Sequence, residues 1–599
     1  MNALTRAWRW ATVSDGILLI PLTAVLACLT LWVHGISCGH DFEFHLVSWM
    51  EAKRAWSQGV LYPHWAQSPN WEAGEPRFVF YPPVTWMLGA ALGCIVPWTW
   101  VPVIISLLFL SGSGFATRAL ARQFLPGPVA TAAGCLATAT PYAFFSAFER
   151  TAYSEMAAAI WIPLLLLFAL RQKTAPQSSL NSPQRTLAQS FARSFDGSAA
   201  LLALVLAACW LTNAPSGVMA SYLLAFTALV AALALRAWWP VLRAAAAAVI
   251  GIGLTAFYLV PAAWEQRWIA INQALDVGMR IADSWLFARH ASPDLLLHDE
   301  ILWAASTIFV FTAAMGVLGL GIALLRGKLP RETRTWWLPL ALLIPALLLL
   351  QLPFSAPLWR LLPKLQFLQF PWRWLMVLGT PFAIFLAAAT PLASRRARWA
   401  SLLFWALAIG GYTTISTRVF FQFCDEEDRV SNQVVLFQDS MGVAGTDEYA
   451  PSGADNTLVA SGLPDACLVN DPTAELGKAE GDAVPVWIAE RGICNQTYKA
   501  QLWQDEHKQL EFNSDQDGFL ILRLRRYPAW RITVNGKQIA GKLPQRDDGL
   551  IVLPLKEGPA RIDIRWQDTP DIPWGRDLSL AALVALLAIW FLERRTQRA

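Results

Sequence analysis

The chain has 599 residues, of which 55% are hydrophobic and 15% are charged, and its formal net charge is +4. An ordinary soluble domain has about 25% charged residues, so this composition indicates a membrane protein. No basic patch with interleaved aromatic residues lies outside the apolar runs, which argues against a nucleic-acid partner.

Apolar runs that approach the roughly 17 to 25 residues of a spanning helix recur along the chain. We expect about twelve spans, near residues 16–36, 98–117, 127–147, 154–170, 198–212, 216–235, 244–262, 301–325, 336–352, 371–393, 399–417 and 575–592. The first run lacks a small-residue cleavage site, so we expect it to remain as a span. Residues 81–98 are also apolar, but this stretch is short and opens with two prolines.

The positions of Lys and Arg predict the topology, because these residues favour cytoplasmic loops. If residues 81–98 do not cross the membrane, every basic loop lies on the same side as Arg6 and Arg9, starting with Arg118 and Arg122. If they do cross, the basic loops are inverted. We therefore expect a re-entrant or interfacial helix at 81–98 and a first loop that faces outward.

Three parts follow from this pattern: a transmembrane domain at 1–418, an outer domain at 419–573, and a closing span with a short tail at 574–599. Short apolar or alternating runs in the outer domain predict strands. These runs are 519–524, 530–534, 550–555 and 560–566. Asn535-Gly536 is a strong signal for a two-residue hairpin turn, and we expect a β-sandwich.

Four of the eight cysteines, Cys38, Cys424, Cys467 and Cys494, fall on the outer side, where disulfides form. A bond between Cys467 and Cys494 is one expectation, and the connectivity stays open. The other four cysteines lie in apolar runs and are expected to be small core residues.

Polar residues gather at the outward ends of the apolar runs, and the densest group is His40, Asp41, Glu43 and His45. Charged groups at membrane depth are costly and usually pair or serve a site. Asp41 and His45 are four residues apart and are expected on one helix face, with Glu43 pointing off it. Further members are Glu72, Glu75, Arg77, Glu149, Arg150, Tyr153, Glu155, Asn213, Glu265, Arg267, Gln366, Gln369 and Arg373. Ordinary interfacial anchors are the alternative interpretation.

Several short motifs resemble those of polytopic glycosyltransferases of the GT-C superfamily. They are Asp41-Phe42-Glu43-Phe44-His45, Gly59-Val60-Leu61-Tyr62-Pro63-His64-Trp65, Gly74-Glu75-Pro76, Phe80-Tyr81-Pro82-Pro83, Arg150-Thr151-Ala152-Tyr153-Ser154-Glu155, Phe370-Pro371-Trp372-Arg373-Trp374, Glu448-Tyr449-Ala450-Pro451 and Tyr527-Pro528-Ala529-Trp530. Within the superfamily the chain is most similar to a bacterial membrane family labelled "6-pyruvoyl-tetrahydropterin synthase-related", although no motif for pterin chemistry is visible. Ala529 stands where that family usually has Gly.

The resemblance implies an α-helical polytopic enzyme of the bacterial inner membrane, with its site and β-sandwich on the periplasmic side. It implies an inverting transferase that moves a sugar from a polyprenyl-phosphate donor to an envelope glycan, lipid or protein. A site that faces outward also needs a donor carried by lipid, because nucleotide sugars are cytoplasmic.

Specific roles are implied as well. Asp41 is the expected catalytic base or metal ligand, with Glu43 and His45 beside it, and Mg²⁺ or Mn²⁺ is the ion that carboxylates favour. Arginine binds phosphate through two parallel hydrogen bonds. The expected substrate-binding residues are Glu75, Arg77, Tyr81, Arg150, Tyr153, Glu155, Asn213, Gln369 and Arg373.

Two other classes of function stay open. The first is a non-enzymatic lipid or glycan translocase, or an envelope assembly scaffold, whose β-domain binds carbohydrate; its function would not need Asp41. The second is a polymerase or ligase of lipid-linked glycans, which would need a long acceptor groove.

Overall fold

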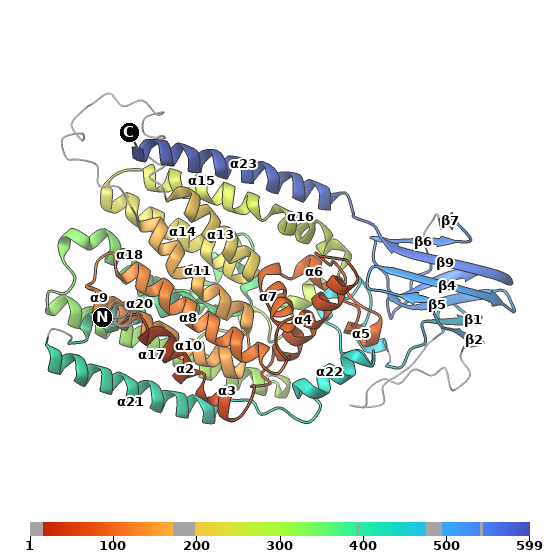
Figure 1. Cartoon of the computed structure of the whole chain (residues 1–599), viewed down its shortest axis with the longest axis horizontal. Coiled ribbons are helices and arrows are strands. Elements are labelled where there is room, and N and C mark those ends of the chain that lie inside the picture. Colours follow the sequence, from red (N-terminus) through yellow and green to blue (C-terminus); the bar gives the residue numbers. More distant parts are fainter. Residues whose placement is uncertain are drawn as a thin grey trace, which may run out of the picture.

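The computed structural model of the protein describes residues 16–171, 198–391, 394–459, 461–474, 494–539 and 543–598. A bundle of helices forms one end of the molecule and β-strands form the other (Figure 1). Short helices lie between the two parts. These are α4 (Phe42–Ser57), α5 (Pro69–Glu72), α6 (Arg77–Phe80), α7 (Pro83–Gly93) and α22 (Val430–Gln438). Arg6 and Arg9 lie outside the described residues.

The bundle is built from apolar helices of very different lengths. Its helices are α2 (Leu19–Ala27), α3 (Leu29–Val33), α8 (Val101–Ala121), α9 (Gly127–Thr138), α10 (Pro141–Phe144), α11 (Tyr153–Leu170), α13 (Ala199–Thr212), α14 (Ala214–Leu235), α15 (Trp239–Leu254), α16 (Ala256–Glu265), α17 (Leu296–Leu325), α18 (Arg334–Leu349), α19 (Ala356–Leu361), α20 (Leu375–Ala389), α21 (Arg395–Phe420) and α23 (Asp571–Arg598). The last helix, α23, returns from the strands and runs along α15 and α16 (Figure 1).

Seven of the described helices are long and apolar enough to cross a membrane, or nine if each of two bent pairs is one span. The prediction of about twelve spans is higher, because several apolar runs are not single long helices. The run at 127–147 breaks before Pro141, whose ring disfavours helical geometry at Thr140. The run at 16–36 breaks at Cys28. Helix α7 has 11 residues, too few to span, as expected for residues 81–98.

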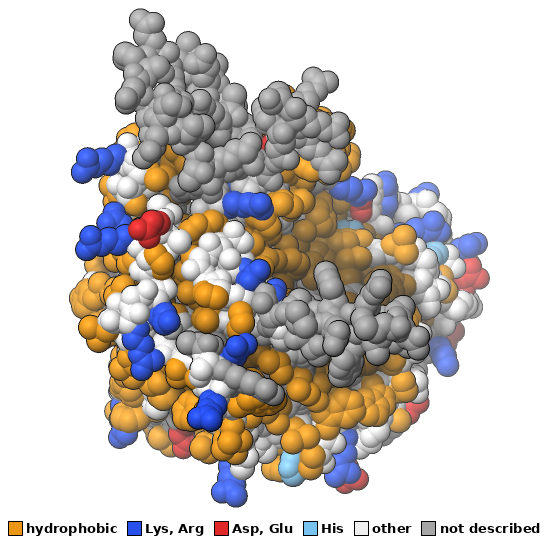
Figure 2. All heavy atoms as spheres, turned by 60° about the vertical axis from the view of Figure 1, so that its left-hand side comes forward, with side chains coloured by type: hydrophobic (Ala, Val, Ile, Leu, Met, Phe, Trp, Pro, Cys, Tyr) orange, Lys and Arg blue, Asp and Glu red, His pale blue; other side chains and the backbone are white. Residues whose placement is uncertain are grey.

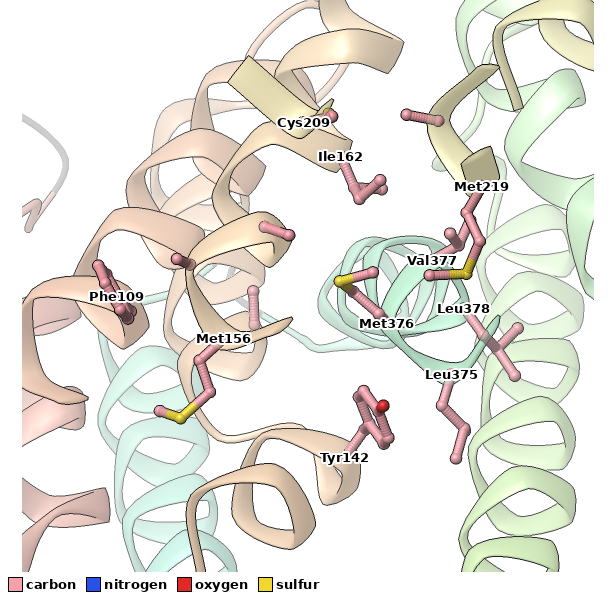
Figure 3. Close-up of a cluster of buried hydrophobic side chains, with 14 of the residues drawn as sticks. Phe109, Tyr142, Met156, Ile162, Cys209, Met219, Leu375, Met376, Val377 and Leu378 are labelled. Atoms are coloured by element: carbon pink, nitrogen blue, oxygen red, sulfur yellow. The ribbon is translucent and has the colours of Figure 1, made fainter. Parts of the chain in front are cut away.

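Helix α20 lies at the centre of the bundle. Its residues Leu375, Met376, Val377 and Leu378 are buried and point toward different neighbours (Figure 3). Helices α17, α9 and α18 pack most closely against it. The same buried cluster includes Phe109, Tyr142, Met156, Ile162, Cys209 and Met219. This packing holds the N-terminal end of α20, and with it the preceding residues 369–374, in a fixed position.

The β-strands form two antiparallel sheets. Their strands are β1 (Ala466–Val469), β2 (Gln496–Tyr498), β3 (Leu502–Trp503), β4 (His507–Ser514), β5 (Gly518–Arg525), β6 (Trp530–Val534), β7 (Lys537–Gln538), β8 (Leu550–Leu555) and β9 (Gly558–Trp566). The strand orders are β2-β1-β5-β8 and β3-β4-β9-β6-β7. Leu468 and Leu520 of one sheet share a buried cluster with Leu510 and Ile562 of the other, as in a sandwich. The predicted Asn535-Gly536 turn joins β6 and β7.

The segment between α3 and α8, which is called the first outer loop, packs against these sheets. Trp65 is fully buried, and its ring lies 5.1 Å from that of Trp530. His64 stacks on Trp566 with ring centres 5.5 Å apart. Arg54 of α4 also pairs with Asp505 at 3.0 Å. The outer domain (419–573) therefore helps to hold the first outer loop, which contains the predicted residues from Asp41 to Tyr81.

Two disulfides join segments that are predicted to face outward. The Cys467–Cys494 bond confirms that expectation. The Cys38–Cys424 bond was not predicted; it links cysteines 386 residues apart. Because Cys38 lies three residues before Asp41, this bond anchors the start of the first loop to the segment after α21.

Figure 2 brings the helical end of the molecule forward. Lys and Arg side chains are scattered over the apolar surface there, and Asp and Glu are sparse. This is the charge distribution that the preference of basic residues for cytoplasmic loops predicts. The orientation relative to a membrane stays a prediction.

Candidate active site

A cavity of about 760 Å³ lies where the first outer loop meets the ends of α11, α14, α17 and α20. Nine of the predicted site residues line it: Asp41, Glu43, Arg77, Tyr81, Arg150, Glu155, Asn213, Gln369 and Arg373. His45, Glu75 and Tyr153 are buried behind its wall. Three lining segments were not predicted, namely residues 277–279, 294–302 and 443–446.

Asp41 is held at the start of α4 by residues 145–152, which lie between α10 and α11 and are called the second outer loop. Its backbone N–H donates to the carbonyl oxygen of Arg150 at 2.9 Å. This contact depends on Gly39, because a side chain there would collide with the carbonyl oxygen of Glu149. The Asp41 carboxylate also accepts a hydrogen bond from Arg150 Nη2 at 3.1 Å, and its side chain is 40% exposed. The carboxylate is therefore fixed on one side and accessible on the other.

Glu155 lies between two arginines. Its Oε1 atom is 2.7 Å from Arg150 Nη1 and 3.1 Å from Arg373 Nε, and Tyr142 donates its hydroxyl to Oε2. The neighbouring carboxylates, above all Glu155, keep the pKa of Arg150 above its usual value despite burial. Arginine keeps its charge in proteins, so two guanidinium groups lie on one wall of the cavity, where they can receive an anion.

The backbone is strained beside both arginines. Thr151, next to Arg150, has φ +46°, and Gln369, four residues before Arg373, has φ +62°. A β-branched residue rarely adopts this left-handed conformation. Gln369 accepts a hydrogen bond from Arg373 and donates one to the carbonyl oxygen of Ala274 at 2.8 Å. Strained residues of this kind cluster at functional sites.

The expectation that Asp41 and His45 share the working face, with Glu43 turned away, is wrong. Asp41 is the N-cap of α4 and its backbone is not helical, so the helical face rule does not apply to it. Glu43 lines the cavity, and burial raises the pKa of its carboxyl. His45 packs against Tyr153 and Trp49 instead, and burial lowers the pKa of its ring to about 4. His45 is therefore neutral at pH 7.

Tyr81 and Asn213 form a neutral polar side of the cavity. The hydroxyl of Tyr81 donates to Ser154 Oγ at 2.9 Å, and Asn213 Nδ2 donates to the same oxygen at 3.0 Å. Asn213 Oδ1 accepts from the backbone N–H of Ser216 and caps α14. These groups suit the hydroxyls of a sugar better than a charged phosphate.

Glu75 and Arg77 connect the cavity wall to the outer domain. Glu75 Oε1 is 2.7 Å from Arg77 Nε, and Glu75 Oε2 accepts from the backbone N–H of Thr446 at 2.8 Å. The Arg77 guanidinium lies 4.3 Å from the ring centre of Phe44. Glu75 therefore positions Arg77 and the 443–446 segment and does not itself face the cavity.

A metal ion on Asp41 stays a prediction. Within the described part of the chain, the one group of three ligand side chains close enough to hold an ion is His290, His298 and Asp299. Among the described residues, Asp41 and Glu43 belong to no such group, and His45 does not line the cavity.

No family model and no curated protein matches the chain, so the closer resemblance to the family labelled "6-pyruvoyl-tetrahydropterin synthase-related" is not supported. Two solved structures of the oligosaccharyltransferase of the archaeon Archaeoglobus fulgidus are distantly similar. The apo form is 14% identical over 74% of this chain and 61% of that one, with a TM-score of 0.40. The complex of the same enzyme, AglB, with an inhibitory peptide and a dolichol-phosphate is 13% identical over 75% and 61%, with a TM-score of 0.38. The chain thus spans about three fifths of their length.

Proposed function

We propose that the protein is a membrane glycosyltransferase that moves a sugar from a polyprenyl-phosphate donor to an extracytoplasmic acceptor. The observation that carries this proposal is the placement of one accessible carboxylate, Asp41, beside two buried arginines, Arg150 and Arg373, on the wall of one cavity. A base next to a phosphate site is what transfer from a sugar phosphate requires.

In the proposed reaction, the Asp41 carboxylate takes the proton from an acceptor hydroxyl as that oxygen attacks the anomeric carbon. The new glycosidic C–O bond forms while the bond from the anomeric carbon to the phosphate oxygen breaks. The lipid phosphate leaves with the electron pair, and Arg150 and Arg373 stabilise its charge. A single displacement of this kind inverts the anomeric centre. No step is assigned to a metal ion.

The surroundings support a lipid-borne donor. The cavity lies at one end of a bundle whose helices include seven that are long and apolar enough to cross a membrane, counted over the described residues. Tyr81 and Asn213 provide neutral hydrogen-bonding groups for the sugar.

Glu43 also lines the cavity, and its raised pKa makes it the alternative proton acceptor. We place the transferase body at 1–418 and propose that the 419–573 domain, which contributes residues 443–446 to the cavity, helps to bind the acceptor.

The test is mass spectrometry of lipid carriers and envelope glycans in a bacterial strain that lacks the chain. We expect a polyprenyl-phosphate sugar to accumulate and one sugar to be missing from an envelope product. The wild-type chain should restore both, and Asp41→Asn should restore neither. The matched control is Asp439→Asn, because Asp439 is exposed and does not line the cavity. Full restoration by Asp41→Asn would favour the translocase or scaffold instead.

A further inference from the structure

His290, His298 and Asp299 form a second cluster of ligand-type side chains near the cavity. His290 lies in the segment between α16 and α17, and the other two lie in the first turn of α17. Asp299 Oδ1 is 2.6 Å from His290 Nδ1, and Asp299 Oδ2 accepts from the backbone N–H of His290 at 2.8 Å. Loop and helix are thereby fixed to each other through this one carboxylate.

The spacing of the three side chains fits a single metal ion. One ligand atom from each lies within 4.8 Å of the others. The ring centres of His290 and His298 are 5.8 Å apart. Two imidazoles bound to one ion at about 2.0 to 2.1 Å place their ring centres about 5 to 6 Å apart. The side chains of His290 and Asp299 are 21% and 14% exposed, so an ion can reach them.

His298 is already oriented as a metal ligand. Its Nε2 atom lies 3.0 Å from the carbonyl oxygen of Asp283. A carbonyl oxygen only accepts hydrogen bonds, so Nε2 carries the proton and the lone pair of the neutral ring lies on Nδ1. Metal-binding histidines usually donate their second ring N–H in this way. The carboxylate of Asp283 is itself held by the backbone N–H of Gly278 and by Arg280, which keeps the carbonyl in place.

The ligand types select the class of ion. Two imidazole nitrogens with one carboxylate favour Zn²⁺ and related transition metals, whereas Mg²⁺, Ca²⁺ and Mn²⁺ favour oxygen ligands. We propose that His290, His298 and Asp299 bind one divalent transition-metal ion of the Zn²⁺ class. Since His298 lines the cavity, the ion lies at the cavity wall and is reachable from it. This site shares no ligand with the metal site that was predicted at Asp41.

Metal titration of the full-length protein in detergent tests this site directly. After treatment with a chelator, we expect wild-type protein to bind one Zn²⁺ per chain in equilibrium dialysis. His298→Ala should lower the affinity by at least about 10-fold, since it removes one of three ligands. The matched control is His507→Ala, because His507 also pairs with an aspartate, Asp563, at 2.8 Å but has no place in such a cluster. It should bind as wild type does.

Several results would overturn the proposal: no stoichiometric binding by wild-type protein, equal affinity in His298→Ala, or loss of the ion in Asp41→Asn alone.

A second measurement uses wild-type protein only, so it does not depend on whether a variant folds. Zn²⁺ at 100 times its dissociation constant should stabilise the chain by the mass-action effect of a bound ligand, and the melting temperature should rise. Mg²⁺ at the same concentration should leave it unchanged. An equal rise with both ions contradicts a site with nitrogen ligands. None of these readouts depends on transferase activity.

Discussion

Asp41 and Arg150 are joined twice, once through the backbone and once through their side chains. The Asp41 N–H donates to the Arg150 carbonyl oxygen at 2.9 Å, and Arg150 Nη2 donates to the Asp41 carboxylate at 3.1 Å. The proposed base on the first outer loop is thus positioned by the proposed phosphate ligand on the second. A change to Arg150 is therefore expected to affect both the phosphate site and the position of the base.

Arg150→Lys keeps the positive charge but cannot contact Asp41 and Glu155 at once, because lysine lacks the planar fork of arginine. Misplacement of a reacting group by about 1 Å costs about 10²-fold, and we expect a loss of this size in kcat/KM for sugar transfer by purified protein. The matched control is Arg267→Lys, since the Arg267 guanidinium lies over Trp264 and does not line the cavity. A change of less than twofold in Arg150→Lys would show that the double contact has no role in transfer.

The buried ring of His45 predicts a pH-dependent stability. In the unfolded chain this ring takes a proton below about pH 6.5. In the folded chain its pKa is about 4, because burial outweighs the nearby carboxylates of Asp41 and Glu155. The unfolded state therefore binds more protons between these values, and the free energy of unfolding falls by about 3 kcal/mol as the pH drops from 6.5 to 4.

His45→Gln removes this titration, so its unfolding free energy should change less than that of wild type over the same pH range. Urea unfolding at several pH values, followed by tryptophan fluorescence, measures the difference. The matched control is the exposed His34, whose replacement by Gln should leave the wild-type slope. Equal slopes for wild type and His45→Gln would mean that the ring is not buried in the neutral form.

Much of the site follows from sequence, because polar residues at the ends of apolar runs are few. Asp41, Arg150 and Arg373 were predicted for that reason, and all three line the cavity. His298 was not, because nothing in its neighbourhood marks it and only the folded chain brings the start of α17 to the first loop.

Local rules also failed at element boundaries. The face rule misplaced His45 and Glu43 because Asp41 is a cap and not a helical residue. The predicted count of spans exceeds the number of long apolar helices among the described residues, because an apolar run does not reveal where a helix breaks, as one does before Pro141. Cys38 and Cys424 are too far apart for any spacing to indicate a bond, whereas Cys467 and Cys494 are separated by only 27 residues.

The two disulfides should differ in their effects on activity. Cys38→Ser with Cys424→Ser frees the segment three residues before Asp41, and we expect lower stability, by about 2 to 4 kcal/mol, together with slower transfer. Cys467→Ser with Cys494→Ser serves as the matched control, because that bond lies among the strands; it should lower stability without slowing transfer. Thermal unfolding and transfer rates are measured for both double variants. Equal transfer rates in the two would show that the Cys38–Cys424 bond does not position Asp41.

Cys94 offers a test of topology. It is an exposed free cysteine just after α7, in the 81–98 stretch that is predicted not to cross the membrane. A membrane-impermeant thiol reagent added to intact cells should label wild-type protein and spare Cys94→Ala. In the Cys94→Ala background, Lys328→Cys lies in an exposed turn after α17 and should be labelled only after the cells are opened. Labelling of Lys328→Cys but not of Cys94 in intact cells would show that the orientation is the reverse of the one proposed.

The most direct test of the proposed function separates donor binding from transfer in purified Asp41→Asn protein. The substitution keeps the size of the side chain and removes its ability to accept a proton. With the donor identified from the deletion strain, we expect donor affinity within about twofold of wild type and a transfer rate lower by about 10² to 10⁴-fold, while Asp439→Asn retains both. A folded Asp41→Asn protein that transfers the sugar at the wild-type rate would contradict the assignment of Asp41 as the base and, with it, the proposed transferase.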